Sequence, residues 1–311
     1  MIVVMQDGCE LLFVDQPGER LDLWITRRFP GLTRTTVQKW IEAGLVLVNG
    51  ESVKKRYQPE SGDEIQVQFA PPPELSLEPE PMDLDILFED EDLIVLNKPA
   101  GLVVHPGAGN TSGTLVNGLL AHCRSLPSGG VRPGLVHRLD KATSGILVVA
   151  KTSEAHVALV QQFAAREVEK IYYAVCHGRP TTSGCSEPLG RDPHHRQKMA
   201  VRPDGKNAET SWRLLGEALG LALLEVAPHT GRTHQIRVHL KWVGCPILGD
   251  VTYTHPSLAT TAQSLPRHWL HAARLTFTHP RTKQRMSLTA PVPQELHHML
   301  PPAFTPFLSS L

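Results

Sequence analysis

The sequence predicts an α+β protein, built on a mixed, mainly antiparallel sheet with flanking helices and preceded by a smaller α+β module. Strand-like segments follow one another as hairpins, with helical segments between some of them. A proline-rich and acidic stretch, APPPELSLEPEPMD at residues 70–83, predicts an extended linker at 71–81. No glycine-rich nucleotide loop follows a strand, so we do not expect a dinucleotide or P-loop fold.

The module before the linker, residues 15–70, is expected to hold two helices and a hairpin. Helical spacing of apolar residues marks 19–29 and 32–44, the second with Thr33 as its cap. Asn49 and Gly50 predict a tight turn between two short strands, and 63–69 alternates like a strand. The polar sides carry a basic set, which is either an RNA-binding face or a solvated surface: Arg27, Arg28, Arg34, Lys39, Lys54, Lys55 and Arg56.

The body, residues 82–302, alternates between strand-like and helix-like segments. We expect helices at 114–123 and at 153–168, the latter capped by Ser153. Residues 255–268 are expected to form a mobile loop. The predicted strands lie at 92–98, 144–151, 169–178, 220–228 and 234–240, with a hairpin at 274–290.

The amino-acid composition limits the classes of protein to which this chain could belong. The 311 residues include 31 basic and 31 acidic side chains, which argues against a protein that coats nucleic acid through a global positive field. Five scattered cysteines without a C-x-x-C pair favour free thiols over a disulfide framework or a zinc site. The sequence has no apolar run long enough for a membrane span and no N-terminal signal pattern. We therefore expect a cytoplasmic protein without a metal.

Three segments could carry chemistry: GLVHRLDKATSGILVVAKT at 134–152, KIYYAV at 170–175, and PHTGRTHQIRVHLKWVG at 228–244. Read as a strand, 234–240 turns Gln235, Arg237 and His239 away from its apolar face. An arginine that faces Asp140 would keep that carboxylate ionised and able to act as a nucleophile or base. The alternatives are an Asp140 that caps a turn and tyrosines that belong to the core and its rim.

Taken together, these segments resemble the RluA-type pseudouridine synthases, which isomerise uridine in ribosomal and transfer RNA. The likeness covers residues 82 to about 295. It includes HRLDKATSGILVVAK, EKIYYAV, GRTHQIRVHL, PILGDVTY and WLHAARLTFTHP. The N-terminal module is similar to the S4-type RNA-binding domain that precedes the catalytic domain in the RluD branch.

The resemblance implies a role for each matching residue. Asp140 would be the catalytic aspartate, Tyr172 would stack on the uracil and assist proton removal, and Arg237 would pair with Asp140. Arg138 would fill the space left by the flipped uridine, and Leu139 would pack near the base. The same motifs place His137, Arg232, His234 and Gln235 at the substrate. The reaction oxidises nothing and releases no group, so the resemblance implies no cofactor.

The implied partner is large-subunit ribosomal RNA, free or in an assembling subunit, bound by a monomer that needs no membrane. Three alternatives remain open: a synthase that acts on transfer RNA, a catalytically silent RNA-binding or ribosome-assembly protein, and an aspartate-dependent glycosidase. A glycosidase normally needs two carboxylates that flank the scissile bond, and only Asp140 is a candidate here.

Overall fold

The computed structural model describes residues 2–4, 9–15, 17–29, 34–69, 77–107, 110–123, 126–127, 132–195, 197–309 and 311. The chain divides into two compact units, Met1–Leu75 and Ser76–Leu311. The cap predicted at Thr33 lies outside the described residues. In the part of the chain that is described, no helix is long and apolar enough to cross a membrane.

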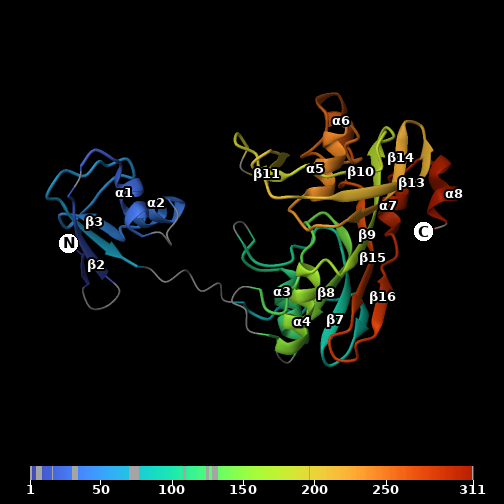
Figure 1. The fold of residues 1–311 in the computed structure, drawn as a ribbon, viewed down its shortest axis with the longest axis horizontal. Coiled ribbons are helices and arrows are strands. Elements are labelled where there is room, and N and C mark those ends of the chain that lie inside the picture. The colour runs from blue at the N-terminus through green and yellow to red at the C-terminus, as the bar shows by residue number, and fades with distance from the viewer. Residues whose placement is uncertain are drawn as a thin grey trace. The chain divides into compact units, whose positions relative to one another are not determined.

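The first unit packs two helices on a five-stranded antiparallel sheet of order β1-β2-β5-β3-β4 (Figure 1). Trp24 and Ile25 of one helix and Val37 and Ile41 of the other are buried against the sheet, as their spacing predicts. The elements are β1 (Ile2–Val4), β2 (Cys9–Phe13), α1 (Leu21–Arg28), α2 (Arg34–Glu42), β3 (Val46–Val48), β4 (Glu51–Ser52) and β5 (Glu64–Gln68).

The second unit is built on a nine-stranded sheet, with strand order β10-β13-β14-β9-β15-β8-β7-β6 and with β16 paired to β15. The pairs are antiparallel except β8 with β15, so the predicted mixed, mainly antiparallel sheet is confirmed. The strands are β6 (Ile86–Glu89), β7 (Leu93–Lys98), β8 (Ser144–Ala150), β9 (Glu169–His177), β10 (Gly184–Cys185), β13 (Thr210–Ala218), β14 (Leu221–Pro228), β15 (Leu270–Thr278) and β16 (Arg285–Thr289). A separate pair joins β11 (Leu189–Arg191) to β12 (Met199–Val201).

The strands β8 and β15 come unusually close where they pair. Gly145 has a φ of +115°, and a Cβ there would lie 2.1 Å from the carbonyl oxygen of Ala272. Only glycine fits this backbone approach. Since β8 directly follows the turn that carries Asp140, this glycine allows the strand after that turn to pair with β15.

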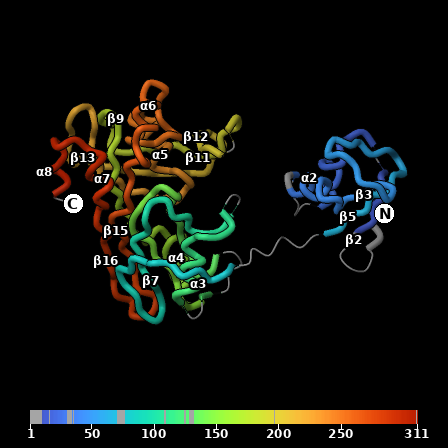
Figure 2. Tube along the Cα trace, turned by 180° about the vertical axis from the view of Figure 1, so that it is seen from behind, coloured from blue at the N-terminus to red at the C-terminus, as the bar shows by residue number. Residues whose placement is uncertain are grey.

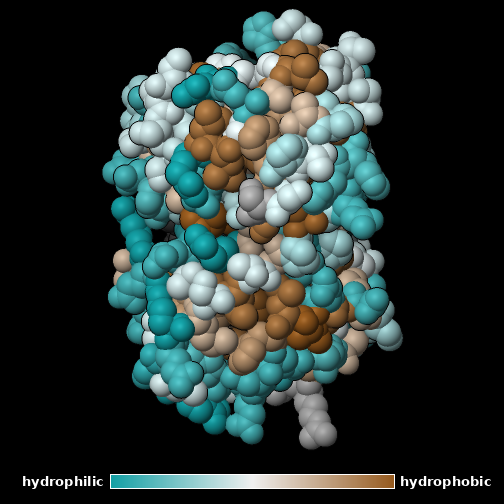
Figure 3. Space-filling view, turned by 90° about the vertical axis from the view of Figure 1, so that its right-hand side faces the viewer, coloured by the Kyte–Doolittle hydropathy of each residue, from teal (hydrophilic) through white to brown (hydrophobic). Residues whose placement is uncertain are grey.

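Helices cover this sheet at two places (Figures 1 and 2). In both views α3 (Leu115–His122) and α4 (Ser153–Ala164) lie at the end with β7 and β8, and α5 (Gln235–Trp242) lies near β11 at the other. The remaining helical segments are η1 (Pro256–Leu258), α6 (Ala259–Gln263), α7 (Gln294–His298), η2 (Pro302–Phe304) and α8 (Thr305–Leu308). Seen from the side of β16 and α8, the surface shows hydrophobic patches broken up by hydrophilic side chains (Figure 3).

Three local predictions were wrong. Residues 235–242 form a helix, not a strand, because Ile236 and Leu240 are four apart and share the buried face of a helix. The cap of α4 is Thr152, whose hydroxyl accepts the N–H of Ala155, and not Ser153. The segment 255–268, expected to be a mobile loop, contains η1 and α6.

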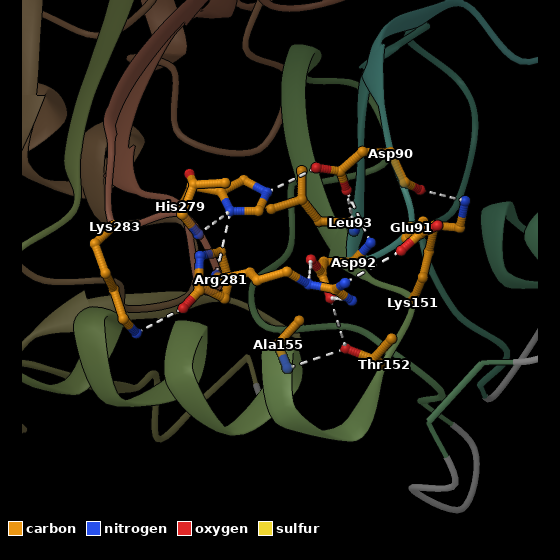
Figure 4. A network of polar contacts seen from close by, with 12 residues as sticks. Asp90, Glu91, Asp92, Leu93, Lys151, Thr152, Ala155, His279, Arg281 and Lys283 are labelled. Carbon is orange, nitrogen blue, oxygen red and sulfur yellow. Dashed lines mark hydrogen bonds and ion pairs between the residues drawn. The ribbon is translucent and has the colours of Figure 1, made fainter.

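A polar network ties the turn before β7 to the turn between β15 and β16 (Figure 4). The Asp90 carboxylate accepts the backbone N–H groups of Asp92 and Leu93 and lies 2.7 Å from Nε2 of His279. Arg281 pairs with Asp92 at 2.6 Å. Asp90, Asp92 and His279 offer ligand atoms close enough for a metal, yet these protein contacts already use them. We therefore infer that this group of residues stabilises the fold by connecting the two turns.

Candidate active site

Asp140 lies in a turn whose backbone is fixed from several sides. Its carbonyl oxygen accepts the N–H of Thr143 at 3.1 Å. The buried ammonium of Lys98 donates to the carbonyl of Lys141 at 3.2 Å, and Arg267 donates to that of Ala142 at 3.2 Å. The side chain of Asp140 stays 20 % exposed. The turn is therefore rigid, while its carboxylate remains accessible.

The carboxylate of Asp140 accepts a hydrogen bond from Nη1 of Arg237 at 3.0 Å, so the predicted pair is present. Arg237 also donates to both oxygens of the buried Asp250, at 2.6 and 3.0 Å. Burial alone would lower the pKa of Arg237, but the hydrogen bonds and charges of Asp250 and Asp140 raise it. Its charge is permanent, and the guanidinium is held in one orientation before any ligand arrives.

His234 approaches the same carboxylate from the start of α5, where it adopts a left-handed φ of +55°. Its Nε2 lies 3.8 Å from Oδ2 of Asp140, and its Nδ1 lies 2.7 Å from the hydroxyl of Tyr253. That hydroxyl accepts the N–H of Met199 at 2.8 Å and has no other acceptor among the described residues, so it donates to Nδ1. Burial lowers the pKa of His234, and the neutral ring therefore carries its proton on Nε2, toward Asp140.

Tyr172 lies on β9, between Val226 of β14 and Ala272 of β15. It packs against both of the large hydrophobic clusters of this unit, so its ring stands where the two halves of the core meet. Burial and the charge of Asp140 raise the pKa of its hydroxyl, which keeps it protonated. No residue in the described part of the chain hydrogen-bonds that hydroxyl, which leaves it available to a ligand.

These side chains line one cleft of about 520 Å³, a volume suited to a small ligand or to one nucleotide. Its walls come from the turn before β8, the end of α4, strand β9 and the segment 228–237. Among the lining residues Asp140 is the single carboxylate. The cationic lining residues are Arg138, Arg166, Lys170, Arg232 and Arg237.

The motif before β8 divides into buried and exposed side chains. Arg138 is exposed at the cleft, and Leu139 is 4 % exposed within the core. His137 stacks on Phe163, and its Nε2 accepts the N–H of Val148 at 3.0 Å. Burial lowers the pKa of His137 to about 3. This neutral histidine therefore uses a ring nitrogen to anchor the loop to β8.

The motif before α5 is similarly divided. The Gln235 side chain accepts the Thr230 hydroxyl and the Arg232 N–H, and it donates to the carbonyl of Glu209 and the hydroxyl of Thr210. Gln235 thus shapes the loop, with its amide fully engaged. Arg232 donates to the carbonyl of Asn207 at 3.0 Å from a half-buried position on the cleft wall. His239, on the same helix, is buried and bonds to Thr210.

In the first unit, several of the predicted basic residues pair with acids. Arg27 pairs with Glu19, Arg28 with Asp15, Arg34 with Asp22 and Lys55 with Glu42. Arg28 also stacks over the ring of Trp24. Within the described residues, no hydrogen bond or ion pair engages the charged ends of Lys39, Lys54 and Arg56. These three are the most available cations of the set.

Sequence reasoning missed five residues around the site: Lys98, Arg166, Lys170, Asp250 and Tyr253. Lys170 could have been found, because it lies two positions before Tyr172 on a strand and so shares its face. Asp250 and Tyr253 lie within a segment already singled out, but no spacing rule links that segment to Arg237. Only the folded chain shows this link.

Comparisons with known proteins agree across both units. A family model described as RNA pseudouridylate synthase matches residues 92–242, and an S4 domain model matches residues 19–65. A Bacillus subtilis protein named "Uncharacterized RNA pseudouridine synthase YlyB" is 43% identical over 92% of this chain and 94% of its own. "Ribosomal large subunit pseudouridine synthase D" of Neisseria meningitidis is 45% identical over 91% of this chain and 78% of its own. The solved human RNA Pseudouridylate Synthase Domain Containing 4 superposes with a TM-score of 0.55 at 30% identity, over 70% of this chain and 91% of that one.

Proposed function

Because this chain belongs to the RNA pseudouridine synthases and carries an S4 domain, we propose that it isomerises particular uridines of large-subunit ribosomal RNA. The relative whose name specifies the large ribosomal subunit supports this target. The proposal rests chiefly on one observation. Asp140 is the only carboxylate among the described residues that line the cleft, and it is held 3.0 Å from Arg237 while still partly exposed.

In this proposal Asp140 acts on the ribose or the base of a uridine flipped out of its stack. The bond from N1 of uracil to the sugar C1′ breaks, the base rotates within the cleft, and C5 forms the new bond to C1′. The proton on C5 leaves and N1 gains one, so the isomerisation is balanced. Unstacking the uridine costs a few kcal/mol, which contacts to the RNA must offset.

The other side chains have supporting roles. Tyr172 offers a ring for the detached uracil to stack on. Its raised pKa favours a protonated hydroxyl that hydrogen-bonds the base over a phenolate that takes the C5 proton. Arg237 keeps Asp140 ionised, and the exposed Arg138 enters the gap left in the RNA. His234 directs its Nε2–H to the carboxylate.

A single carboxylate disfavours the glycosidase alternative, which needs an acid and a base on opposite sides of the bond. The catalytically silent alternative gives no reason for a charged residue to be held beside Asp140 in a cleft. A binder of phosphates would gain from losing the carboxylate, since it repels the RNA backbone.

The test is release of tritium from RNA labelled at uracil C5. We expect release from large-subunit rRNA with wild-type protein, and none above background with Asp140→Asn, which keeps the shape of the side chain. Retained RNA binding by Asp140→Asn would show that the variant is folded. If wild-type protein released no tritium from any RNA, the proposal that it is an active pseudouridine synthase would be wrong. Release from transfer RNA alone would overturn the proposed target.

A further inference from the structure

One wall of the cleft carries two cations that the proposed chemistry does not use. Lys170 begins the cleft face of β9, and Arg166 lies in the turn that joins α4 to β9. Their charges interact with each other, since that of Arg166 lowers the pKa of Lys170. Within the described part of the chain, neither side chain forms a salt bridge with a carboxylate. Two like charges are therefore held together on the wall of an open cleft.

Lys170 has few hydrogen bonds for the ammonium group of a half-buried side chain. Its Nζ is 3.4 Å from the carbonyl oxygen of Thr230, a long and weak contact. An ammonium group has three donors, so most of its capacity is unused. Burial and the charge of Arg166 together lower the pKa of Lys170 to about 8.

The contrast with Lys98 is informative, because Lys98 is a buried structural lysine of the same unit. Its Nζ donates to three carbonyl oxygens, those of Pro99, Leu102 and Lys141, at 2.7, 2.9 and 3.2 Å. The fold therefore satisfies a lysine completely where it needs one for structure. Lys170 is left with capacity for a ligand that lies in the cleft.

Arg166 is presented in an unusual way. It has a φ of +61°, a left-handed conformation that is uncommon for arginine. The turn is closed by hydrogen bonds from the N–H of Arg166 to Phe163 and from that of Glu167 to Gln162. This turn leaves the Arg166 side chain exposed at the cleft, on the side of Lys170.

We propose that Lys170 and Arg166 form a subsite for one backbone phosphate next to the flipped uridine. The subsite rests on the proposed function, since it names where the same RNA is held. Lys170 and Tyr172 share a face of β9 and are about 6.6 Å apart along the strand. That separation matches a phosphate that neighbours a base stacked on Tyr172. A phosphate would accept hydrogen bonds from both cations and neutralise their repulsion.

The test uses the full chain in the Asp140→Asn background, so that binding is measured without turnover. The variants are Lys170→Met, Arg166→Met and the double variant. The control is Lys283→Met, a lysine in the exposed turn between β15 and β16 whose Nζ donates to the carbonyl of Pro280. RNA affinity is measured against salt concentration. RNA affinity falls as salt rises, so this slope is negative. Each subsite variant is expected to reduce the steepness of the fall in log K with log salt by about 0.7, and the double variant by about 1.4.

A substitution in the RNA provides the second measurement. Methylphosphonate linkages remove one phosphate charge at a time on either side of the target uridine. We expect one linkage to weaken binding by the Asp140→Asn protein about 5- to 10-fold, and to have no further effect on the double variant. Lys170→Arg should remain sensitive to that linkage, because it keeps the charge that Lys170→Met removes.

The two measurements separate this subsite from the proposed function. Unchanged salt slopes, or full sensitivity of the double variant to every linkage, would overturn the subsite while leaving tritium release by the wild-type protein untouched. Absence of tritium release with normal salt slopes would overturn the function alone. The same substitutions are also made in the protein that keeps Asp140, where turnover can be measured. If they lower kcat there while RNA affinity in the Asp140→Asn background is unchanged, the two cations belong to the chemical step and the subsite is wrong.

Discussion

Arg237 bridges two carboxylates of different exposure. It donates to the accessible Asp140 at 3.0 Å and to both oxygens of the buried Asp250. The contact of Nε and Nη2 with Asp250 fixes the plane of the guanidinium, and Nη1 is thereby aimed at Asp140. Tyr253 adds a second constraint, with its ring centroid 4.9 Å from the guanidinium carbon. Asp140 thus faces a cation whose position costs nothing to arrange when RNA binds.

The first prediction concerns the contacts of Arg237 with its two carboxylates. Arg237→Lys keeps the charge but cannot reach both carboxylates, because an ammonium group lacks the planar, bidentate geometry. We expect kcat for tritium release to fall about 100-fold, with a much smaller change in KM, since the lost contact orients the reacting carboxylate. The matched control is Arg213→Lys, whose pair with Glu225 lies on an exposed sheet surface. A wild-type kcat in Arg237→Lys would refute the positioning role.

The second prediction concerns the tautomer of His234. Tyr253→Phe removes the hydroxyl that donates to Nδ1, which favours the neutral ring, so the pKa of His234 is expected to rise. The acid limb of the pH profile of kcat/KM should therefore move to higher pH. Rates at neutral pH should fall about 3- to 10-fold. Tyr173→Phe is the control, because no described residue hydrogen-bonds its hydroxyl. An acid limb that stays in place would show that Tyr253 only fills space.

Much of the fold could be predicted because local patterns and tertiary packing agree. Residues 144–150 are wholly buried on both faces, as an uninterrupted apolar run predicts. Asn49 and Gly50 both have positive φ, as the predicted hairpin requires. The strand predicted at 234–240 was wrong because, over so few residues, strand alternation and helical spacing fit the same apolar positions. The helix begins at Gln235, whose side chain hydrogen-bonds to backbone and hydroxyl groups around the first turn.

The sequence predicted the residues at the centre of the candidate site, but not the residues that hold them in place. Asp140 and Arg237 are 97 positions apart, so no local spacing places them together. The charge argument suggested this pair before the fold was known, and the resemblance to a family implied it. Asp250 carries no sequence signal of its role, because its partner is set by how α5 packs against the chain that follows it. Lys98 lies 43 positions from the carbonyl that it holds beside Asp140. Such supports depend on tertiary contacts that local spacing does not encode.

The third prediction concerns acid stability. Burial lowers the pKa of His268 and of His271 to about 4, while the unfolded chain would protonate both near 6.5. Between these values the unfolded state binds more protons, so stability falls as pH drops from about 6.5 to 4. Each histidine contributes a slope of about 1.4 kcal/mol per pH unit in that window.

The measurement is urea unfolding at several pH values, followed by tryptophan fluorescence. His271→Gln should lower the slope of stability against pH by about one proton, whatever its effect on stability at neutral pH. His194→Gln, at an exposed site, should leave the slope unchanged. An unaltered slope in His271→Gln would mean that His271 is protonated in the folded protein.

The last prediction concerns the first unit. Deleting residues 1–75 should leave a body that folds and retains kcat within a few-fold, because the lining of the cleft lies wholly in Ser76–Leu311. KM for rRNA should rise about 10-fold or more, since any phosphate contacts that the S4 domain contributes would be lost. Tritium release against RNA concentration measures both constants. A folded but inactive 76–311 would show that the first unit takes part in the chemistry.

The residue at which the deletion ends decides whether the experiment measures loss of the first unit alone. The N–H of Glu80 donates to the carbonyl of Asn117, and the amide of Asn117 donates to the carbonyl of Glu78. The Glu80 carboxylate also accepts the N–H of Gly113. Residues 78–80 therefore hold the start of α3. A deletion through residue 82 should lower the stability of the body by ~1–3 kcal/mol, because it leaves the buried Asn117 without these partners. Comparing the two deletions separates loss of RNA affinity from damage to the fold.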